Sequence, residues 1–129
     1  MRAIDTNVIV RFLTGDDPDQ AGRARRLIQG GDIFVATSVV LESEWVLRSG
    51  YDFSAERIVN ALRAFAGLPG ITLEDGALVA RALNRVEAGM DFADALHLGR
   101  ADGCSTFMSF DLKLGGIAAR LSDVEVAAP

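Results

Sequence analysis

The sequence predicts an α/β fold in which helices cover both faces of a mainly parallel sheet. Two observations support this: short apolar segments alternate with longer amphipathic ones, and no repeat, composition shift or linker divides the 129 residues. Strands that alternate with helices are typical of parallel sheets, because a parallel connection needs a long crossover. A chain of this length can bury one well-packed core. We therefore expect a single domain over residues 1–129.

The first half of the chain carries clear start and stop signals. Asp17 before Pro18 predicts a helix start, and Ser38 and Ser54 are expected to cap two further helices. Glycines follow each predicted helix or lie near its end. The elements expected here are a strand at 3–4, helical character at 8–13, a helix at 18–29, a strand at 33–36, a helix at 38–48 and a helix from 54 to about 65.

The second half continues the same alternation. Leu78, Ala82 and Leu83 are spaced to share one side of a helix, which predicts a buried face. The elements expected here are a turn at 67–70, a strand at 71–73, helices at 77–86 and 91–101, a strand at 106–109 and a weak strand at 124–126.

Composition excludes several classes of protein. No apolar run approaches the roughly 20 residues of a membrane span, and Asp5 interrupts any signal-peptide core at the N-terminus. Cys104 is the only cysteine, so no disulfide is possible within the chain, and we expect it to be a small buried residue. These features predict a cytoplasmic protein. The net charge of −5 argues against a broad basic surface for nucleic acid.

Four carboxylates, Asp5, Glu42, Asp94 and Asp111, each follow a short apolar run. In parallel α/β folds, ligands bind beyond the carboxyl ends of the strands, and all four side chains are expected at that edge. Clustered acids repel one another unless they share a cation or take up protons. Mg²⁺ and Mn²⁺ prefer oxygen ligands and leave open positions for phosphate oxygens. The four acids therefore predict metal-assisted hydrolysis of a phosphodiester.

Each acid also has a structural interpretation. Asp5 and Asp91 could cap helices, Asp94 could be a first-turn acid, and Asp111 could begin a turn. Glu42 has apolar neighbours, so we expect it to be less exposed than Glu44, which is predicted to be solvated. Further along, His97 is expected to pack within its helix and not to act as a general base.

In its order of motifs, the chain resembles the PIN-domain family, and within it the VapC-like toxins of bacterial toxin–antitoxin pairs. The resemblance spans residues 5 to 111, with Ser109 where the family usually has threonine. Its first and third segments are the most specific. The matching segments are DTNVIVR at 5–11, VLE at 40–42 with WVLR at 45–48, DFADALHL at 91–98 and SFD at 109–111.

The resemblance implies a three-layer α/β/α fold with a parallel five-stranded sheet. It also implies an Mg²⁺- or Mn²⁺-dependent endoribonuclease that cleaves structured RNA such as tRNA or rRNA, forms a homodimer and is silenced by an antitoxin protein. The implied metal ligands and catalytic residues are Asp5, Glu42, Asp94 and Asp111. The implied accessory residues are Asp91, Asn7, Ser109 and Thr6.

Five arginines are candidates for contacts with RNA phosphates or with the antitoxin. We favour Arg11 and Arg48 for this role, and we expect the remaining three to belong to a solvated helix face. A few local guanidinium groups beside an acidic site would bind RNA without a broad basic field. The remaining three are Arg23, Arg25 and Arg26.

Three other functions deserve comparison. A response-regulator receiver domain has a similar size and could use Lys113, but Asp5 is followed by Thr6 where that class needs a second acid. A nucleophilic-aspartate phosphatase would need an acid where Asn7 stands. A catalytically silent binding module with the same fold is the third alternative, and intact acids at all four positions weigh against it.

Overall fold

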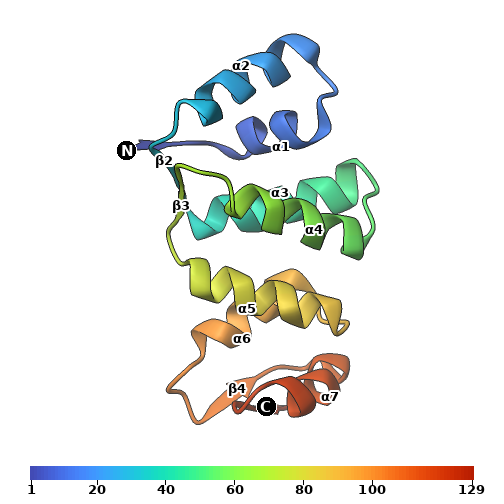
Figure 1. Ribbon diagram of the computed structural model, residues 1–129. Helices are drawn as coiled ribbons and strands as arrows, with labels where there is room; N and C mark the ends of the chain where they lie inside the picture. Colours follow the sequence, from blue (N-terminus) through green and yellow to red (C-terminus); the bar gives the residue numbers. More distant parts are fainter. The chain divides into compact units, whose positions relative to one another are not determined.

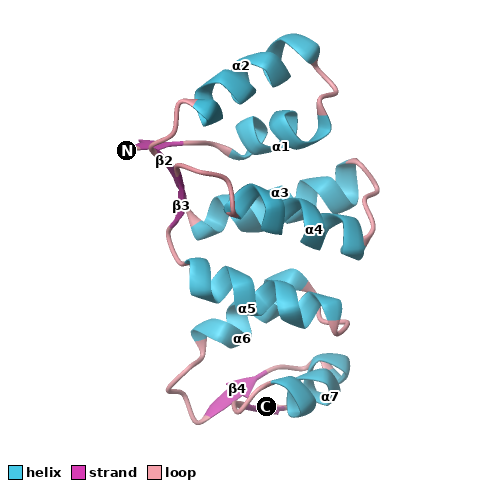
Figure 2. Ribbon diagram, viewed as in Figure 1, coloured by secondary structure: helices cyan, strands magenta, loops and turns pink.

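The computed structural model describes residues 1–129 and divides them into two compact units, which we call unit 1 (Met1–Gly76) and unit 2 (Ala77–Pro129). Seven helices and parallel strands confirm the α/β class (Figures 1 and 2). The expectation of one domain over residues 1–129 stays a prediction. Each unit is described below by itself.

Unit 1 contains a parallel sheet of three short strands in the order β1-β2-β3. Ala3 pairs with Phe34, and Phe34 pairs with Thr72 on the other side. The elements of unit 1 are β1 (Arg2–Ala3), α1 (Thr6–Thr14), α2 (Pro18–Gln29), β2 (Ile33–Val35), α3 (Thr37–Gly50), α4 (Ala55–Ala66) and β3 (Ile71–Leu73).

The core of unit 1 lies around the central strand β2, whose Ile33 and Val35 are completely buried. Helix α1 contacts both α2 and α3, and α1 lies directly beside α2 in Figure 1. The rings of Phe12 and Phe65 meet edge to face with 5.9 Å between their centroids, a favourable geometry for aromatic pairs. The position of α1 is therefore set by its neighbours as well as by its connection to β1.

Three predicted helix starts in unit 1 are confirmed by side-chain caps. Asp5 accepts from the Thr6 N–H (2.8 Å), Asp17 from the Gln20 N–H (3.1 Å) and Ser54 from the Arg57 N–H (3.2 Å). Each cap satisfies a backbone donor that has no partner within the helix.

The prediction that Ser38 caps α3 is wrong. Helix α3 begins at Thr37, and Ala36 before it offers no capping side chain. Instead, Glu74 accepts from the Thr37 N–H at 2.8 Å. A carboxylate that follows β3 therefore replaces the local cap, and sequence spacing alone does not reveal such a distant partner.

Unit 2 contains a parallel pair of strands joined by a helical crossover (Figure 2). Its elements are α5 (Gly76–Glu87), which starts at the last residue of unit 1, α6 (Phe92–Arg100), β4 (Thr106–Met108), α7 (Leu112–Leu121) and β5 (Glu125–Ala127). The predicted apolar side of α5 is confirmed, because Leu78, Ala82 and Leu83 are buried. Helix α7 was not among the expected elements, and Gly115 and Gly116 in its middle have low helix propensity.

Two sequence expectations differ from the structure at this level. The strands form one sheet of three and one of two, so a single five-stranded sheet is not shown. Cys104 is exposed, so its expected role as a buried filler is wrong. It lies in the stretch between α6 and β4, outside the apolar faces of both. None of the helices combines the length and apolarity needed to cross a membrane.

Candidate active site

Asp5 and Glu42 line the same cleft in unit 1, which has a volume of about 410 Å³. Asp5 lies between β1 and α1, and Glu42 lies on α3. The cleft is thus built where a strand ends and two helices meet, as expected for the carboxyl edge of a parallel sheet. The lining residues are Asp5, Thr6, Asn7, Val10, Arg11, Glu42, Val46 and Tyr51.

Asp5 has both a structural and an available oxygen. Its Oδ1 caps α1 by accepting from the Thr6 N–H, and this contact fixes the direction of the carboxylate. Its Oδ2 accepts no hydrogen bond from the protein, and the residue is exposed. Capping and ligand binding are therefore compatible in one side chain, and the two sequence interpretations of Asp5 do not exclude each other.

Glu42 is exposed and makes no hydrogen bond or ion pair, whereas Glu44 is only 5% exposed. The prediction ranked these two residues the wrong way round. The buried positions of α3 include Val40 and Leu47, and helical spacing places Glu44 on their side. Glu44 is compensated by Arg48, whose Nε donates to it at 2.9 Å. Arg48, expected to contact RNA, is thus paired within its own helix.

Unit 2 brings three further acids to the starts of two helices. Asp91 caps α6 by accepting from the Asp94 N–H (3.1 Å), as predicted, and Asp94 lies in the first turn. Asp111 caps α7 by accepting from the Leu114 N–H at 3.1 Å. The Ser109 hydroxyl accepts from the Asp111 N–H at 3.0 Å, so Ser109 orients the backbone of that acid.

These acids influence one another electrostatically. Partial burial raises the pKa of Asp94, and the negative charges of Asp91 and Asp111 raise it further, while His97 acts in the opposite direction. The three carboxylates are therefore close enough to repel, which a bound cation would relieve. His97 is exposed, so the expectation that it packs within the fold is wrong.

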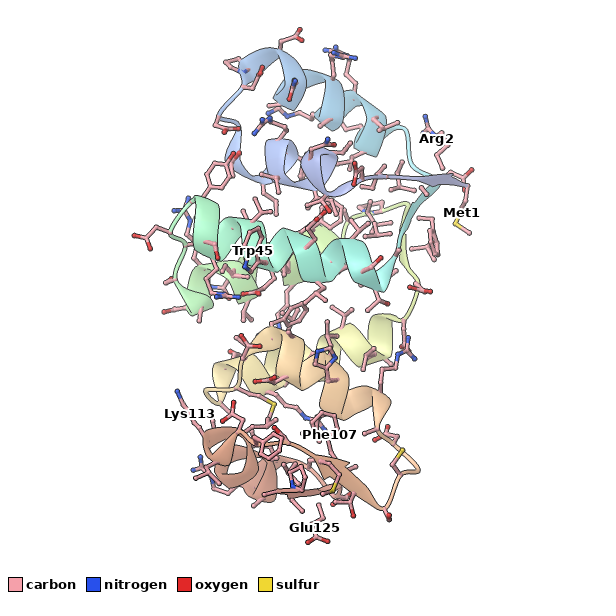
Figure 3. The ribbon with its side chains drawn as sticks, turned by 180° about the vertical axis from the view of Figure 1, so that it is seen from behind. Met1, Arg2, Trp45, Phe107, Lys113 and Glu125 are labelled. Carbon is pink, nitrogen blue, oxygen red and sulfur yellow. The ribbon has the colours of Figure 1, made fainter.

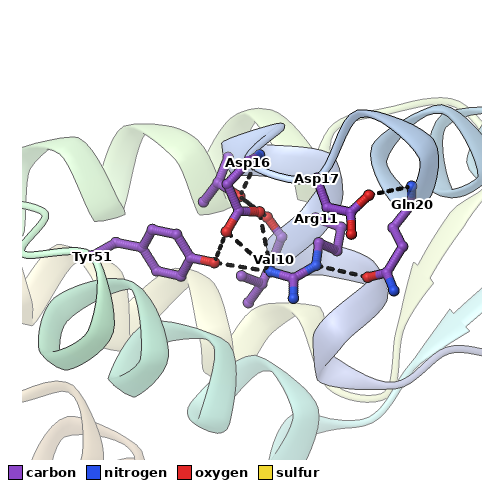
Figure 4. Close-up of polar contacts among 7 residues, drawn as sticks. Val10, Arg11, Asp16, Asp17, Gln20 and Tyr51 are labelled. Atoms are coloured by element: carbon purple, nitrogen blue, oxygen red, sulfur yellow. Dashed lines mark hydrogen bonds and ion pairs between the residues drawn. The ribbon is translucent and has the colours of Figure 1, made fainter.

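One contact network in unit 1 was not indicated by the sequence. Arg11 donates to Asp16, Gln20 and Tyr51 (Figure 4). The Tyr51 hydroxyl donates to Asp16 and lowers the pKa of that carboxyl, and Thr14 and Arg11 add to this effect against a counteracting effect of burial. Tyr51 is the single tyrosine of the chain and follows the WVLR segment closely, which is the one sequence signal that could have drawn attention to it.

Comparison with known families gives a match to the PIN domain over residues 3–118. The chain belongs to the PIN domain family. A comparison with curated proteins found no significant match. PIN domains are typically metal-dependent nucleases, and the family therefore supports a nuclease activity of the hydrolase class. The matched range includes all of the acids described above.

The donor set of this PIN domain suits a hard divalent cation. All the acids offer carboxylate oxygens, and Asp5 and Asp111 each keep one oxygen outside their capping bond. No group of three or more acidic, histidine or cysteine side chains is arranged to hold a metal ion. Asp5 and Glu42 belong to unit 1, and Asp94 and Asp111 to unit 2. Their convergence on one metal therefore stays a prediction.

Replacing Asp94 by asparagine is expected to raise the midpoint of thermal unfolding by a few degrees at neutral pH in EDTA. The pKa of Asp94 is raised in the folded protein, so the folded state binds more protons and loses stability as pH rises through that pKa. Asparagine removes this loss, and the gain should vanish below the ordinary carboxyl pKa of 3.8. Calorimetry from acidic to neutral pH measures it, with exposed Asp123→Asn as the control. A gain that does not depend on pH would contradict the raised pKa of Asp94.

Proposed function

We propose that this PIN domain is an Mg²⁺- or Mn²⁺-dependent endoribonuclease that acts in the cytoplasm as the toxin of a toxin–antitoxin pair. Its substrate would be structured RNA, such as tRNA or rRNA. The observation that carries the proposal is the acidic edge of each unit: Asp5 and Glu42 share one cleft, and partial burial together with the charges of Asp91 and Asp111 raises the pKa of Asp94. The motif order that resembles VapC-like toxins supports the finer assignment.

In this proposal, Asp5, Glu42, Asp94 and Asp111 would hold the cation. When bound, a divalent cation lowers the pKa of a coordinated water and neutralises charge on the phosphate. Water attacks the phosphorus, the bond to the 3′ oxygen breaks, and the products carry a 5′ phosphate and a 3′ hydroxyl. No other side chain of the chain needs to serve as the nucleophile.

The neighbouring residues would orient the acids. The capping bonds hold the carboxylates of Asp5 and Asp111 in fixed directions, so little rotamer freedom is lost when a ligand binds. Ser109 contributes through the Asp111 N–H. Thr6 and Asn7 line the cleft beside Asp5, where an amide can orient a carboxylate or a water. Asp91 would add negative charge next to Asp94.

The proposed protein partners are a second copy of the chain and an antitoxin. Both follow from the resemblance to VapC-like toxins. Trp45 on α3, labelled in Figure 3, is 57% exposed, and exposed tryptophan is a common anchor of protein interfaces. Expression of the chain is expected to inhibit growth, with relief by an antitoxin encoded nearby.

RNA cleavage assays test the proposal directly. The full chain should cleave RNA with Mg²⁺ or Mn²⁺ and lose this activity in EDTA. Glu42→Gln should slow cleavage by about 100-fold, because a neutral amide binds a cation more weakly than a carboxylate. Glu56→Gln, at an exposed glutamate of α4, is the matched control and should cleave normally. Cleavage that persists in EDTA, or a stable acyl-phosphate formed with a small phosphodonor, would refute the nuclease.

A further inference from the structure

A second cleft of unit 1, of about 360 Å³, lies between α1 and α2. It shares Asn7 and Arg11 with the cleft of Asp5 and Glu42. No acid lines it: its lining combines two guanidinium groups and two amides with apolar side chains. The lining residues are Asn7, Val8, Arg11, Gln20, Arg23, Ala24 and Leu27. The groove therefore offers hydrogen-bond donors to an anion and apolar side chains to an uncharged part of the same ligand.

Arg11, which lines both clefts, is held by three other side chains. Its Nε donates to Gln20 (2.8 Å), and its Nη1 donates to Asp16 (3.0 Å) and to the Tyr51 hydroxyl (3.0 Å). Its Nη2 donates to no protein group and stands apart from the dashed contacts in Figure 4. A guanidinium fixed on one side presents its remaining two donors in a set direction, which favours phosphate recognition.

Arg23 supplies the second cation of the groove. Its only ion pair, with Asp19, is 3.8 Å long, and the two side chains are 69% and 81% exposed. Exposed ion pairs of this kind contribute little to stability, so Arg23 can leave Asp19 and bind a phosphate with only a small loss of free energy. Arg11 differs from Arg23 in this respect. Its ion pair with Asp16 reduces the positive charge that it offers to a phosphate, but it holds the guanidinium in a fixed position.

We propose that the RNA backbone continues from the acidic cleft into the α1–α2 groove, where Arg11 and Arg23 bind a phosphate next to the one that is cleaved. The inference rests on the proposed nuclease function and adds a phosphate subsite to it. Val8, Ala24 and Leu27 supply the apolar lining of the groove, against which a sugar or base can pack. Asp16, Gln20 and Tyr51 are positioning residues, since they act through Arg11.

Binding of a short fluorescent single-stranded RNA in Ca²⁺, measured by anisotropy over a range of salt concentrations, tests the groove. Arg23→Met should weaken binding about tenfold and lower the slope of log affinity against log salt by about 0.7, the loss of one phosphate contact. Arg11→Met should act in the same direction. Arg25→Met is the matched control, because Arg25 lies on the same helix but lines a different cleft with Phe12.

Tyr51→Phe tests the positioning role. It removes the hydroxyl that donates to Asp16 and accepts from Arg11. We expect KM for RNA to rise severalfold with kcat unchanged, and the salt slope to keep its value because both arginines remain. Thermal unfolding is measured for each variant. A fall in kcat that follows a loss of folded protein would mean that Tyr51 is only structural.

The outcomes separate this inference from the nuclease itself. If the wild-type chain cleaves RNA while Arg23→Met and Arg25→Met bind it equally, the groove assignment is overturned and the nuclease remains. If RNA binds with the expected arginine dependence but is never cleaved, the nuclease fails and the phosphate subsite remains. Binding of poly-glutamate, and not RNA, through Arg11 and Arg23 would assign the groove to an acidic protein segment and overturn the proposal.

Discussion

If the chain is the proposed nuclease, Asp5→Asn is expected to lower the rate of metal-dependent RNA cleavage by about 1,000-fold or more, because loss of a proposed metal-binding carboxylate would remove several kcal/mol of transition-state stabilisation. The fold should survive, since asparagine caps helices as well as aspartate and can accept from the Thr6 N–H in the same way. The substitution therefore removes the charge of Asp5 and keeps its role as a helix cap. The measurements are kcat/KM for RNA, Mn²⁺ affinity by calorimetry and the unfolding temperature.

Asp17→Asn is the matched control for this experiment. Asp17 also caps a helix of unit 1, where it accepts from the Gln20 N–H, but it does not line the acidic cleft. The two variants should share nearly the same stability and differ only in metal binding and cleavage. Equal activity in both would show that Asp5 serves only as a cap, which is the alternative that its sequence context leaves open.

Several elements could be predicted because their signals are local. Two helix starts are marked by contacts that reach no more than three residues along the chain. One is Asp17 followed by Pro18, the other is Ser54, and the structure has a helix at each position. The same holds for Asp91 at the start of α6. A cap is a hydrogen bond from the first turn of a helix to a side chain only a few residues away, so the local sequence is enough to predict it.

The remaining features depend on contacts between distant residues. The Thr37 N–H is satisfied by Glu74, which follows another strand, and no spacing rule points to that pair. The apolar neighbours of Glu42 suggested burial, but the helix turns Glu44 inward instead, where Arg48 compensates its charge. The Arg11 network joins α1 to the end of α3 in the same long-range way.

Gly70→Ala is expected to destabilise unit 1 by about 2–4 kcal/mol, combining left-handed backbone strain with a steric clash. Gly70 has φ of +80°, and an added Cβ would lie 2.6 Å from the Gly31 Cα, a backbone atom that no side-chain rotation can move. Gly70 also accepts from the Ile33 N–H at 2.9 Å, so the clash separates β3 from β2. The unfolding midpoint should fall by roughly 10 °C.

Gly15→Ala separates strain from clash. Gly15 has φ of +66°, similar to Gly70, but an added Cβ there would meet no atom within 4 Å. Gly15→Ala should therefore lower the free energy of unfolding by only about 1 kcal/mol, the strain of placing alanine in the left-handed region. Equal losses in the two variants would contradict the close approach of Gly70 to Gly31. Because Glu74 follows β3 and caps α3, we also expect Gly70→Ala, and not Gly15→Ala, to disturb Glu42 and weaken Mn²⁺ binding at permissive temperature.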